Sequence, residues 1–346
     1  MALTSSGTIK YSEIIAEFGT PTNTSAGLGE FRVSENVGTL NNLPLDLGVP
    51  QSGEIKFSDF YGKRLNQIVD LYSIGNNTSR QNAKDRWNNG NVHIVGSTKT
   101  GKAIPPDTVD DKVIINVNAT ISSVKGTQTH CALRTGNWDT NTTLSIEIGS
   151  LGKLYGSGGD GGDGGSADES PGTDGGTGSS ALGIQYPCTV NNLGVIQGGY
   201  GGGGGGGGNT RTTGGGRKRG ATTNGASGGG GGGGAGLPAG AAGGVQTPLD
   251  VGGGSAGSDG EAGKLSDVAT GGAGGSEAGE GGDSGGVNQS GGATFHQADD
   301  GGSPEGASAG GLGGANGFAL ITNQSSLPSL TGNTVVGIST ASLSPT

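Results

Sequence analysis

Hydrophobic and polar positions divide the chain into a part with ordinary strand periodicity and a part without it. Within residues 92–148, short β-branched runs are separated by Gly, Asn, Asp and Pro, which is the pattern of strands and turns. The runs cover residues 92–95, 113–117, 119–122 and 144–148. They predict a small sheet or sandwich. Between residues 156 and 317, by contrast, glycine tracts alternate with short polar inserts.

The first 60 residues contain an internal repeat. Residues 6–14 (SGTIKYSEI) return as residues 52–60 (SGEIKFSDF). Each copy has a turn, a short alternation, and then a Ser followed by an acid, as at a helix N-terminus. We expect a strand–turn–helix unit in each copy, with the Ser as cap and one short helix over residues 14–18. So few apolar residues favour a module that docks on something else.

A second repeat marks the start of the glycine-rich half. Residues 151–156 (LGKLYG) return as residues 193–198 (LGVIQG), and each copy follows a strand-like run and precedes a glycine tract. A β-strand is therefore expected to lead into a glycine tract twice. A flexible linker would not need that arrangement.

Composition shows that side chains cannot fill the glycine-rich half. Residues 149–317 hold 66 of the 82 glycines. One interpretation is a random-coil tether. The other makes each tract an extended helix of three residues per turn that bonds to neighbouring tracts through its backbone. Asp160 and Asp163, spaced by three, favour this packed bundle, with both carboxylates on one outward edge.

The predicted fold is therefore mainly β and irregular, with a sandwich of packed polyglycine II helices. Four segments are expected: an attachment module with the internal repeat (1–70), a β-rich domain (71–150), the polyglycine II sandwich with surface loops (151–317), and a C-terminal β segment (318–346).

Charge and hydropathy exclude two classes of partner. Residues 149–317 contain 15 acidic and 6 basic residues, and the whole chain has a formal net charge of −10 with 4 % aromatic residues. This balance argues against nucleic acid as a partner. No stretch approaches the roughly 18 apolar residues of a membrane helix, and the first residues lack a signal-peptide pattern, so neither membrane insertion nor export is expected.

The sequence contains no evident catalytic, metal or cofactor site. His93, His130 and His296 lie in separate segments without ligand spacing. Cys131 and Cys188 are interpreted as buried free thiols, because no zinc-type spacing surrounds them. No nucleophile–base pair is evident either. We therefore expect no enzyme activity, no metal and no cofactor.

The polar inserts hold the remaining chemistry. Residues 209–224 contain four of the six basic residues of the glycine-rich half, and residues 293–300 and 179–192 contain aromatic residues. The candidates are Tyr186, Arg211, Arg217, Lys218, Arg219, Phe295, His296 and Gln297. They are either solvated turns or binding loops on a rigid scaffold.

Residues 143–317 resemble the distal adhesin of T-even-type phage long tail fibres. The resemblance rests on a strand, the LGxLxG and LGxIxG motifs, glycine tracts separated by inserts, and the closing GFALI. It implies a polyglycine II sandwich whose free-end loops contact a host receptor, either lipopolysaccharide or an outer-membrane protein. The basic candidates would then engage anionic glycan groups, and the aromatic candidates and His296 would stack on sugars or protein loops.

The repeated SG-x-IK-[YF]-S-[ED] element, with residues 43–46 and 57–63, resembles N-terminal modules of structural and tail-fibre proteins of marine T4-like phages. This resemblance implies attachment to another phage tail-fibre or baseplate protein. The attachment candidates are Tyr11, Phe57, Phe60 and Tyr61. The aromatic-rich attachment region of the T-even adhesins is not visible, so the module of residues 1–64 is expected either to dock elsewhere on the virion or to mediate self-association.

Together these observations predict a non-enzymatic phage receptor-binding protein at the virion's tail fibre or baseplate periphery. The alternative is a purely structural fibre or connector protein with inert loops. An ice-binding polyglycine protein is disfavoured, because the inserts would interrupt a flat repeated face.

Overall fold

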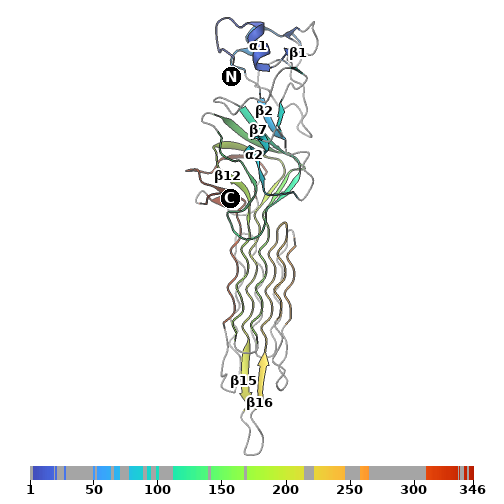
Figure 1. The fold of residues 1–346 in the computed structure, drawn as a ribbon, viewed down its shortest axis with the longest axis vertical. Helices are drawn as coiled ribbons and strands as arrows, with labels where there is room; N and C mark the ends of the chain where they lie inside the picture. Colours follow the sequence, from blue (N-terminus) through green and yellow to red (C-terminus); the bar gives the residue numbers. More distant parts are fainter. Residues whose placement is uncertain are drawn as a thin grey trace, which may run out of the picture.

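The computed structural model is elongated, with a small helical module at one end and a two-stranded hairpin at the other (Figure 1). It describes residues 3–18, 20–21, 27–28, 50, 53–63, 66–70, 78–88, 92–94, 99–100, 112–138, 142–166, 170–213, 222–245, 258–264, 309–333, 335, 339–340 and 343–346. A body of β-strands lies between the two ends.

The two copies of the first repeat form two short helices, α1 (Tyr11–Phe18) and η2 (Phe57–Phe60). The Glu13 carboxylate accepts a hydrogen bond from the Lys10 N–H at 2.8 Å, and the Asp59 carboxylate accepts one from the Lys56 N–H at 2.7 Å. The acid at the third helical position therefore closes the start of both helices. The predicted Ser cap is wrong, because each Ser lies at the second helical position.

The N-terminal module has a small core of its own. Ile14 and Phe60 are fully buried, and the Leu3 N–H donates to the Lys63 carbonyl at 2.7 Å, which joins the start of one copy to the end of the other. Two short strands, β1 (Thr20–Pro21) and β6 (Lys99–Thr100), pair antiparallel.

The body consists of fifteen short strands and one helix among the described residues. They are β2 (Asn66–Asp70), β3 (Thr78–Ser79), β4 (Gln81–Asn82), α2 (Ala83–Asn88), β5 (Val92–Ile94), β7 (Lys112–Val117), β8 (Thr120–Ser122), β9 (Cys131–Arg134), β10 (Thr143–Ile148), β11 (Lys153–Tyr155), β12 (Ser180–Ile184), β13 (Cys188–Asn192), β14 (Val195–Gln197), β17 (Leu320–Thr322), β18 (Ser329–Gly332) and β19 (Ser339–Thr340).

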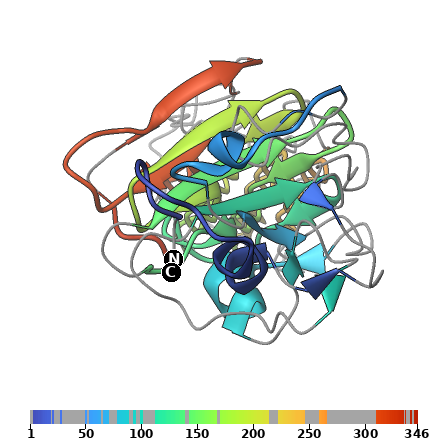
Figure 2. The same ribbon diagram turned by 90° about the horizontal axis from the view of Figure 1, so that it is seen from above.

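These strands form three sheets in which almost every pairing is parallel. The orders are β18-β13-β10-β7-β2-β5, β14-β11-β8-β3 and β19-β17-β12-β9-β4. Apart from the antiparallel edge strand β5, consecutive strands of the body from β2 to β17 fall in the first, second and third sheet in turn, so the chain winds as a β-helix. The last coil contributes β18 to the first sheet and β19 to the third. Seen from above, neighbouring strands follow the colour order of the chain from cyan to red (Figure 2). The strands of residues 92–148 are confirmed, but they do not form an isolated sheet or sandwich.

The two copies of the second repeat, residues 151–156 and 193–198, occupy equivalent positions in two consecutive coils. Leu154 of β11 lies in register with Ile121 of β8 and Ile196 of β14, and all three side chains are fully buried. Such stacked apolar residues from all three sheets form one continuous core inside the β-helix. Because consecutive coils place this strand at the same position, its short sequence pattern returns from one coil to the next.

The C-terminal segment returns to this body. Strand β17 pairs with β12, β18 with β13 and β19 with β17, all parallel. The last residues also contact the body, since the Thr346 N–H donates to the Thr129 carbonyl at 2.8 Å.

Two consecutive coils leave the body at the same corner. The coil β10–β11–β12 is interrupted after β11 by residues 156–179, and the coil β13–β14–β17 is interrupted after β14 by residues 198–319. A β-strand thus leads into a glycine tract twice, as expected. The described tracts, together called the glycine bundle, are 156–166, 170–179, 198–208, 228–236, 240–245, 258–264 and 309–317.

Backbone hydrogen bonds join the tracts with a period of three residues. Along the first tract, the N–H groups of residues 159, 162 and 165 donate to the carbonyls of residues 200, 203 and 206. Those of residues 158, 161 and 164 donate to residues 238, 241 and 244, and the carbonyls of residues 157, 160 and 163 accept from residues 179, 176 and 173. Residues spaced by three along the tract therefore bond to the same neighbouring tract, and the three sets of such residues bond to three different neighbours. A random-coil tether does not fit these described tracts.

Glycine is required because the tracts approach backbone to backbone. A Cβ at Gly159 would lie 1.9 Å from the Gly176 carbonyl oxygen, and one at Gly205 would lie 1.9 Å from the Asp163 carbonyl oxygen. Residues 198–208 are buried along their whole length. Hydrogen-bonded backbone therefore takes the place of packed side chains as the core of this half.

Candidate functional site

The hairpin β15 (Asn209–Thr213) and β16 (Thr222–Ala226) lies at the end of the molecule farthest from α1 (Figure 1). Its strands continue the tracts 198–208 and 228–236 and pair antiparallel over five residues, with Arg211 opposite Asn224. The connection between them, residues 214–221, lies outside the described residues.

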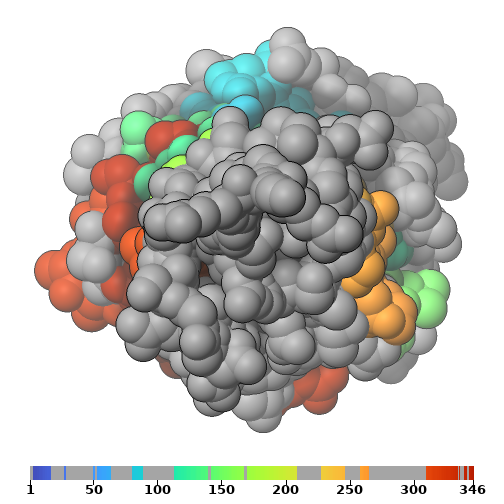
Figure 3. Space-filling view, turned by 90° about the horizontal axis from the view of Figure 1, so that it is seen from below, coloured from blue at the N-terminus to red at the C-terminus, as the bar shows by residue number. Residues whose placement is uncertain are grey.

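Several ends of the glycine tracts meet at this far end. Gly208, the residue before β15, donates its N–H to the Ser170 carbonyl at 3.3 Å, and Gly228 donates to the Gly165 carbonyl at 2.9 Å. Gly164 bonds to the Gly244 carbonyl, and Gly172 bonds to the Ala309 carbonyl. The tract ends that lie here include residues 164–165, 170–172, 208, 228, 244 and 309, and the segments between them are largely outside the described residues. Figure 3 looks at this end along the long axis, with described residues around its edge.

The structure separates the receptor-binding candidates. Arg211 lies in the far hairpin, on β15. Tyr186 lies in the turn between β12 and β13 of the β-helix, where it packs against the hydrophobic core. The expectation that its insert is a loop of the glycine-rich half is wrong, because residues 180–197 form strands β12 to β14. The other candidates, Arg217, Lys218, Arg219, Phe295, His296 and Gln297, lie outside the described residues.

The attachment candidates lie in the N-terminal module at the opposite end. Phe60 is fully buried and forms part of the module's core, whereas Phe57 is 43 % exposed. Tyr11 and Tyr61 are half-buried, and the Tyr61 hydroxyl donates to the Gly7 carbonyl. Among these four aromatic residues, Phe57 offers the most accessible ring to a partner.

Carboxylates line the outside of the glycine bundle and bond to its backbone. Asp163 accepts from the Gly244 N–H at 2.8 Å, Asp174 from the Leu312 N–H at 2.7 Å, and Asp259 from the Val245 N–H at 2.8 Å. These Asp side chains are exposed, as predicted for Asp163 from its spacing with Asp160. They satisfy N–H groups of outer tracts, so the acidic edge helps to hold the bundle together.

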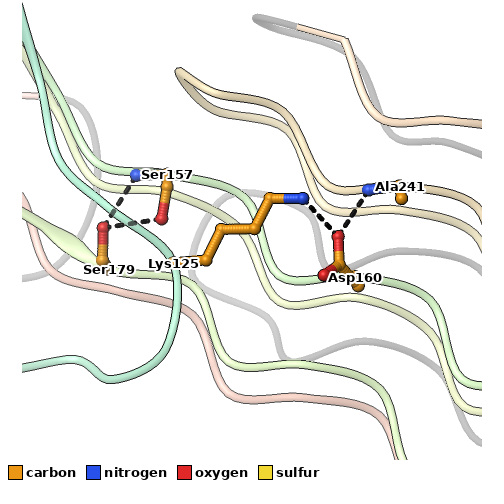
Figure 4. A network of polar contacts seen from close by, with 5 residues as sticks. All are labelled: Lys125, Ser157, Asp160, Ser179 and Ala241. Carbon is orange, nitrogen blue, oxygen red and sulfur yellow. Dashed lines mark hydrogen bonds and ion pairs between the residues drawn. The ribbon is translucent and has the colours of Figure 1, made fainter.

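A polar network surrounds the point where the bundle joins the body (Figure 4). Lys125 and Asp160 form an ion pair at 2.5 Å, and the same Asp160 oxygen accepts from the Ala241 N–H at 2.6 Å. Beside them, the buried Ser157 and Ser179 hydroxyls lie 3.0 Å apart. Sequence analysis missed Lys125, because nothing in its local sequence shows that its loop reaches a tract.

Burial keeps the two cysteines in the thiol form. Cys131 is buried and Cys188 half-buried, and both are free. Desolvation raises the pKa of each thiol to about 12, and for Cys131 the nearby Arg134 and Arg80 lower it only partly. Reactive thiolates are therefore scarce near neutral pH.

Two features are absent from the part of the chain that the structure describes. There, no three His, Cys, Asp or Glu side chains gather in a way that could hold a metal ion. Among the same residues, no helix has the length and apolar character needed to cross a bilayer.

Comparisons with known proteins show the family of the chain. The family model described as phage tail fibre adhesin Gp38 matches residues 82–340, which is 259 of the 346 residues. Among solved structures, a chain of the crystal structure of the gp37–gp38 adhesin tip complex of the bacteriophage S16 long tail fiber is similar at 19 % sequence identity. That similarity covers 93 % of this chain and 100 % of the other, with a TM-score of 0.39. No curated protein matches. The family match spans the β-helix from α2 onward, the glycine tracts and the far hairpin, and the chain therefore belongs to the Gp38 family of phage tail fibre adhesins.

Proposed function

We propose that this tail fibre adhesin recognises the host surface with the far end of its glycine bundle. The observation that supports the proposal is the meeting of the hairpin β15–β16 and several ends of the described glycine tracts at the end farthest from the N-terminal module. Loops on a rigid scaffold are where binding residues usually occur. The chain would act by binding, with no chemical step.

The tracts themselves are proposed to be polyglycine II helices. Three residues per turn would direct every third N–H group to the same neighbour, which is the observed period of the hydrogen bonds. Such a bundle presents its end loops on a stiff support. A stiff support lowers the entropy that the loops would lose on binding.

Charge suggests what the far end binds. Four of the six basic residues between 149 and 317 lie within residues 209–226, a segment that contains no acid. Phosphate or carboxylate groups of lipopolysaccharide would pair with Arg211, Arg217, Lys218 and Arg219. Phe295, His296 and Gln297 would add stacking and hydrogen bonds to sugars or to loops of an outer-membrane protein.

Replacing residues 214–220 by Gly and Ser should slow host adsorption of phage that contain the variant by about tenfold or more. This replacement removes three of the basic candidates, and losing interface hot spots costs about 2 kcal/mol or more. The measurement is the adsorption rate constant on host cells, at low and at high salt, with the larger loss expected at low salt.

The matched control removes the two other basic residues of the glycine-rich half, Lys153 and Lys264, which lie at the body end of the tracts. Lys153→Ser with Lys264→Ser should leave adsorption unchanged. Adsorption that stays normal after the loop replacement would instead favour a structural connector with inert loops.

We also propose that the N-terminal module, within residues 1–70, attaches the adhesin to another tail-fibre or baseplate protein. In this proposal residues 71–150, together with the C-terminal segment 318–346, support the polyglycine sandwich of 151–317. Phe57 is the proposed contact, because its ring is 43 % exposed on a module that lies opposite the far end.

Phe57→Ser should reduce the amount of adhesin that copurifies with virions, while leaving the isolated protein folded. Burying a Phe side chain contributes about 1.5–3 kcal/mol, so a loss of about tenfold or more in affinity is expected. Quantitative immunoblotting of purified virions measures it. Glu54→Ser, at an exposed position of the same module, is the control and should leave incorporation unchanged, whereas wild-type incorporation of the Phe57 variant would contradict this contact.

A further inference from the structure

The loop of residues 123–130, called the brace, lies at the corner where the next two coils leave the body. It joins β8 to β9, whereas at the same corner β11 and β14 lead into glycine tracts. A contact within the loop stabilises its shape, because the His130 ring nitrogen Nδ1 lies 3.1 Å from the Lys125 carbonyl oxygen. Gly126 has φ of 131°, in the region that favours glycine. The brace is therefore a defined turn against the root of the glycine bundle.

One side of the brace holds the first tract. Lys125 Nζ forms the 2.5 Å ion pair with Asp160, and Asp160 in turn accepts from Ala241 of the tract 240–245 (Figure 4). A single lysine therefore reaches two tracts, one directly and one through the shared carboxylate oxygen.

The other side of the brace holds the last tract. The Gln128 side-chain amide donates to the Asn316 carbonyl, and the Asn316 side-chain oxygen accepts from the Gly201 N–H at 2.8 Å. The Gln128 carbonyl also accepts from the Ser180 hydroxyl at 2.5 Å, which places it at the start of β12. Through Gln128 the brace thus reaches the tracts 309–317 and 198–208.

These contacts are placed to resist tilting of the glycine bundle relative to the β-helix more than to stabilise the protein against unfolding. The side chains of Lys125 and Asp160 are 35 % and 51 % exposed, and ion pairs this exposed contribute little to stability. They act, however, on different tracts of the bundle root: Lys125 reaches 156–166 and 240–245, and Gln128 reaches 309–317 and, through Asn316, 198–208. Weak contacts to several tracts at once oppose rotation of the bundle about its root.

We propose that the brace sets the direction in which the glycine bundle leaves the β-helix, with Lys125 and Gln128 as positioning residues. The direction of the bundle determines where its far end points relative to the N-terminal module. The consequence for host attachment rests on the proposed function, but the positioning itself does not.

The test measures the direction of the bundle in the full chain by pulsed electron spin resonance between two spin labels. The labels are attached to Thr189→Cys on β13 and Leu312→Cys on the last tract, both of which are exposed positions. Cys131 and Cys188 should label poorly, because their thiol pKa values are raised to about 12. The double variant Lys125→Ala with Gln128→Ala should broaden or shift the distance distribution, with its melting temperature unchanged.

Two further variants keep the result interpretable. Thr127→Ala, at an exposed position of the same loop, should leave the distribution as it was. Lys125→Arg with Gln128 intact keeps the charge and should also preserve it. If the double variant has the original distribution, the proposal is overturned, whatever happens to its melting temperature. The double variant could have both a lower melting temperature and a broader distance distribution. In that case an original, narrow distribution for Lys125→Arg supports the positioning role, and a broad distribution for Lys125→Arg overturns it.

Host adsorption separates this proposal from the proposed function. A broadened distribution together with normal adsorption would support the brace and count against recognition by the far end. An unchanged distance distribution in the double variant, together with loss of adsorption after replacement of residues 214–220, would overturn the brace proposal and support recognition by the far end.

Discussion

Replacing Gly243 by Ala should lower the free energy of unfolding by about 3 kcal/mol, or prevent the glycine bundle from forming. A Cβ at this position would lie 2.0 Å from the Gly162 carbonyl oxygen and 2.9 Å from the Gly231 backbone nitrogen. Both atoms belong to other tracts and take part in their hydrogen bonds, so neither can move cheaply. Overpacking of this kind costs about 1–3 kcal/mol in ordinary cores and more where backbone must shift. Denaturant unfolding of the purified protein measures the change.

The adjacent residue supplies the control. A Cβ at Gly244 would meet only an Asp163 carboxylate oxygen, at 3.5 Å, which is ordinary contact. Gly244→Ala should therefore be neutral, or stabilise by about 0.4–1 kcal/mol, because Ala has less freedom in the unfolded chain. Equal effects at residues 243 and 244 would contradict a core made of backbone contacts.

Leu154→Ala should lower the free energy of unfolding by about 2–5 kcal/mol, through the cavity left in the β-helix core. Leu154 is fully buried and lies in register between Ile121 and Ile196, so three coils lose contacts together. It also lies in β11, two residues before the first glycine tract begins. Thermal and denaturant unfolding should both report the loss.

The neighbouring residue again supplies the comparison. Lys153 is on the same strand but exposed, so Lys153→Ala should change stability by no more than about 0.5 kcal/mol. A loss at Leu154 as small as that at Lys153 would mean that the stacked apolar residues of the coils do not form the core of the body.

Local patterns predicted the elements of the body well. The β-branched runs at 113–117 and 144–148 became strands β7 and β10, and the repeat at 151–156 and 193–198 became neighbouring strands in register. Strand preference and repetition are properties of short stretches, so they can be read without the fold. The spacing of Asp160 and Asp163 likewise predicted their outward position, because a threefold period needs only local geometry.

Contacts between distant segments could not be predicted in the same way. Tyr186 was expected in a loop of the glycine-rich half, but β12 and β13 on either side of it belong to the β-helix. Lys125 and Asp160 are 35 residues apart, and Gln128 and Asn316 are 188 apart. Only the return of several coils to one corner brings such pairs together.

The sequence by itself determined that side chains cannot form an ordinary core in half of this protein, because 66 glycines among 169 residues leave too few apolar side chains for one. It also determined the tail-fibre character, through motifs that lie within short stretches. Tertiary structure alone decided that the tracts leave one corner of a β-helix and that the hairpin β15–β16 lies opposite the N-terminal module. The physical reason is that glycine tracts are nearly identical to one another. Which tract bonds to which neighbour therefore depends on where the chain leaves the β-helix, after β11 and β14, and where it returns, at β12 and β17.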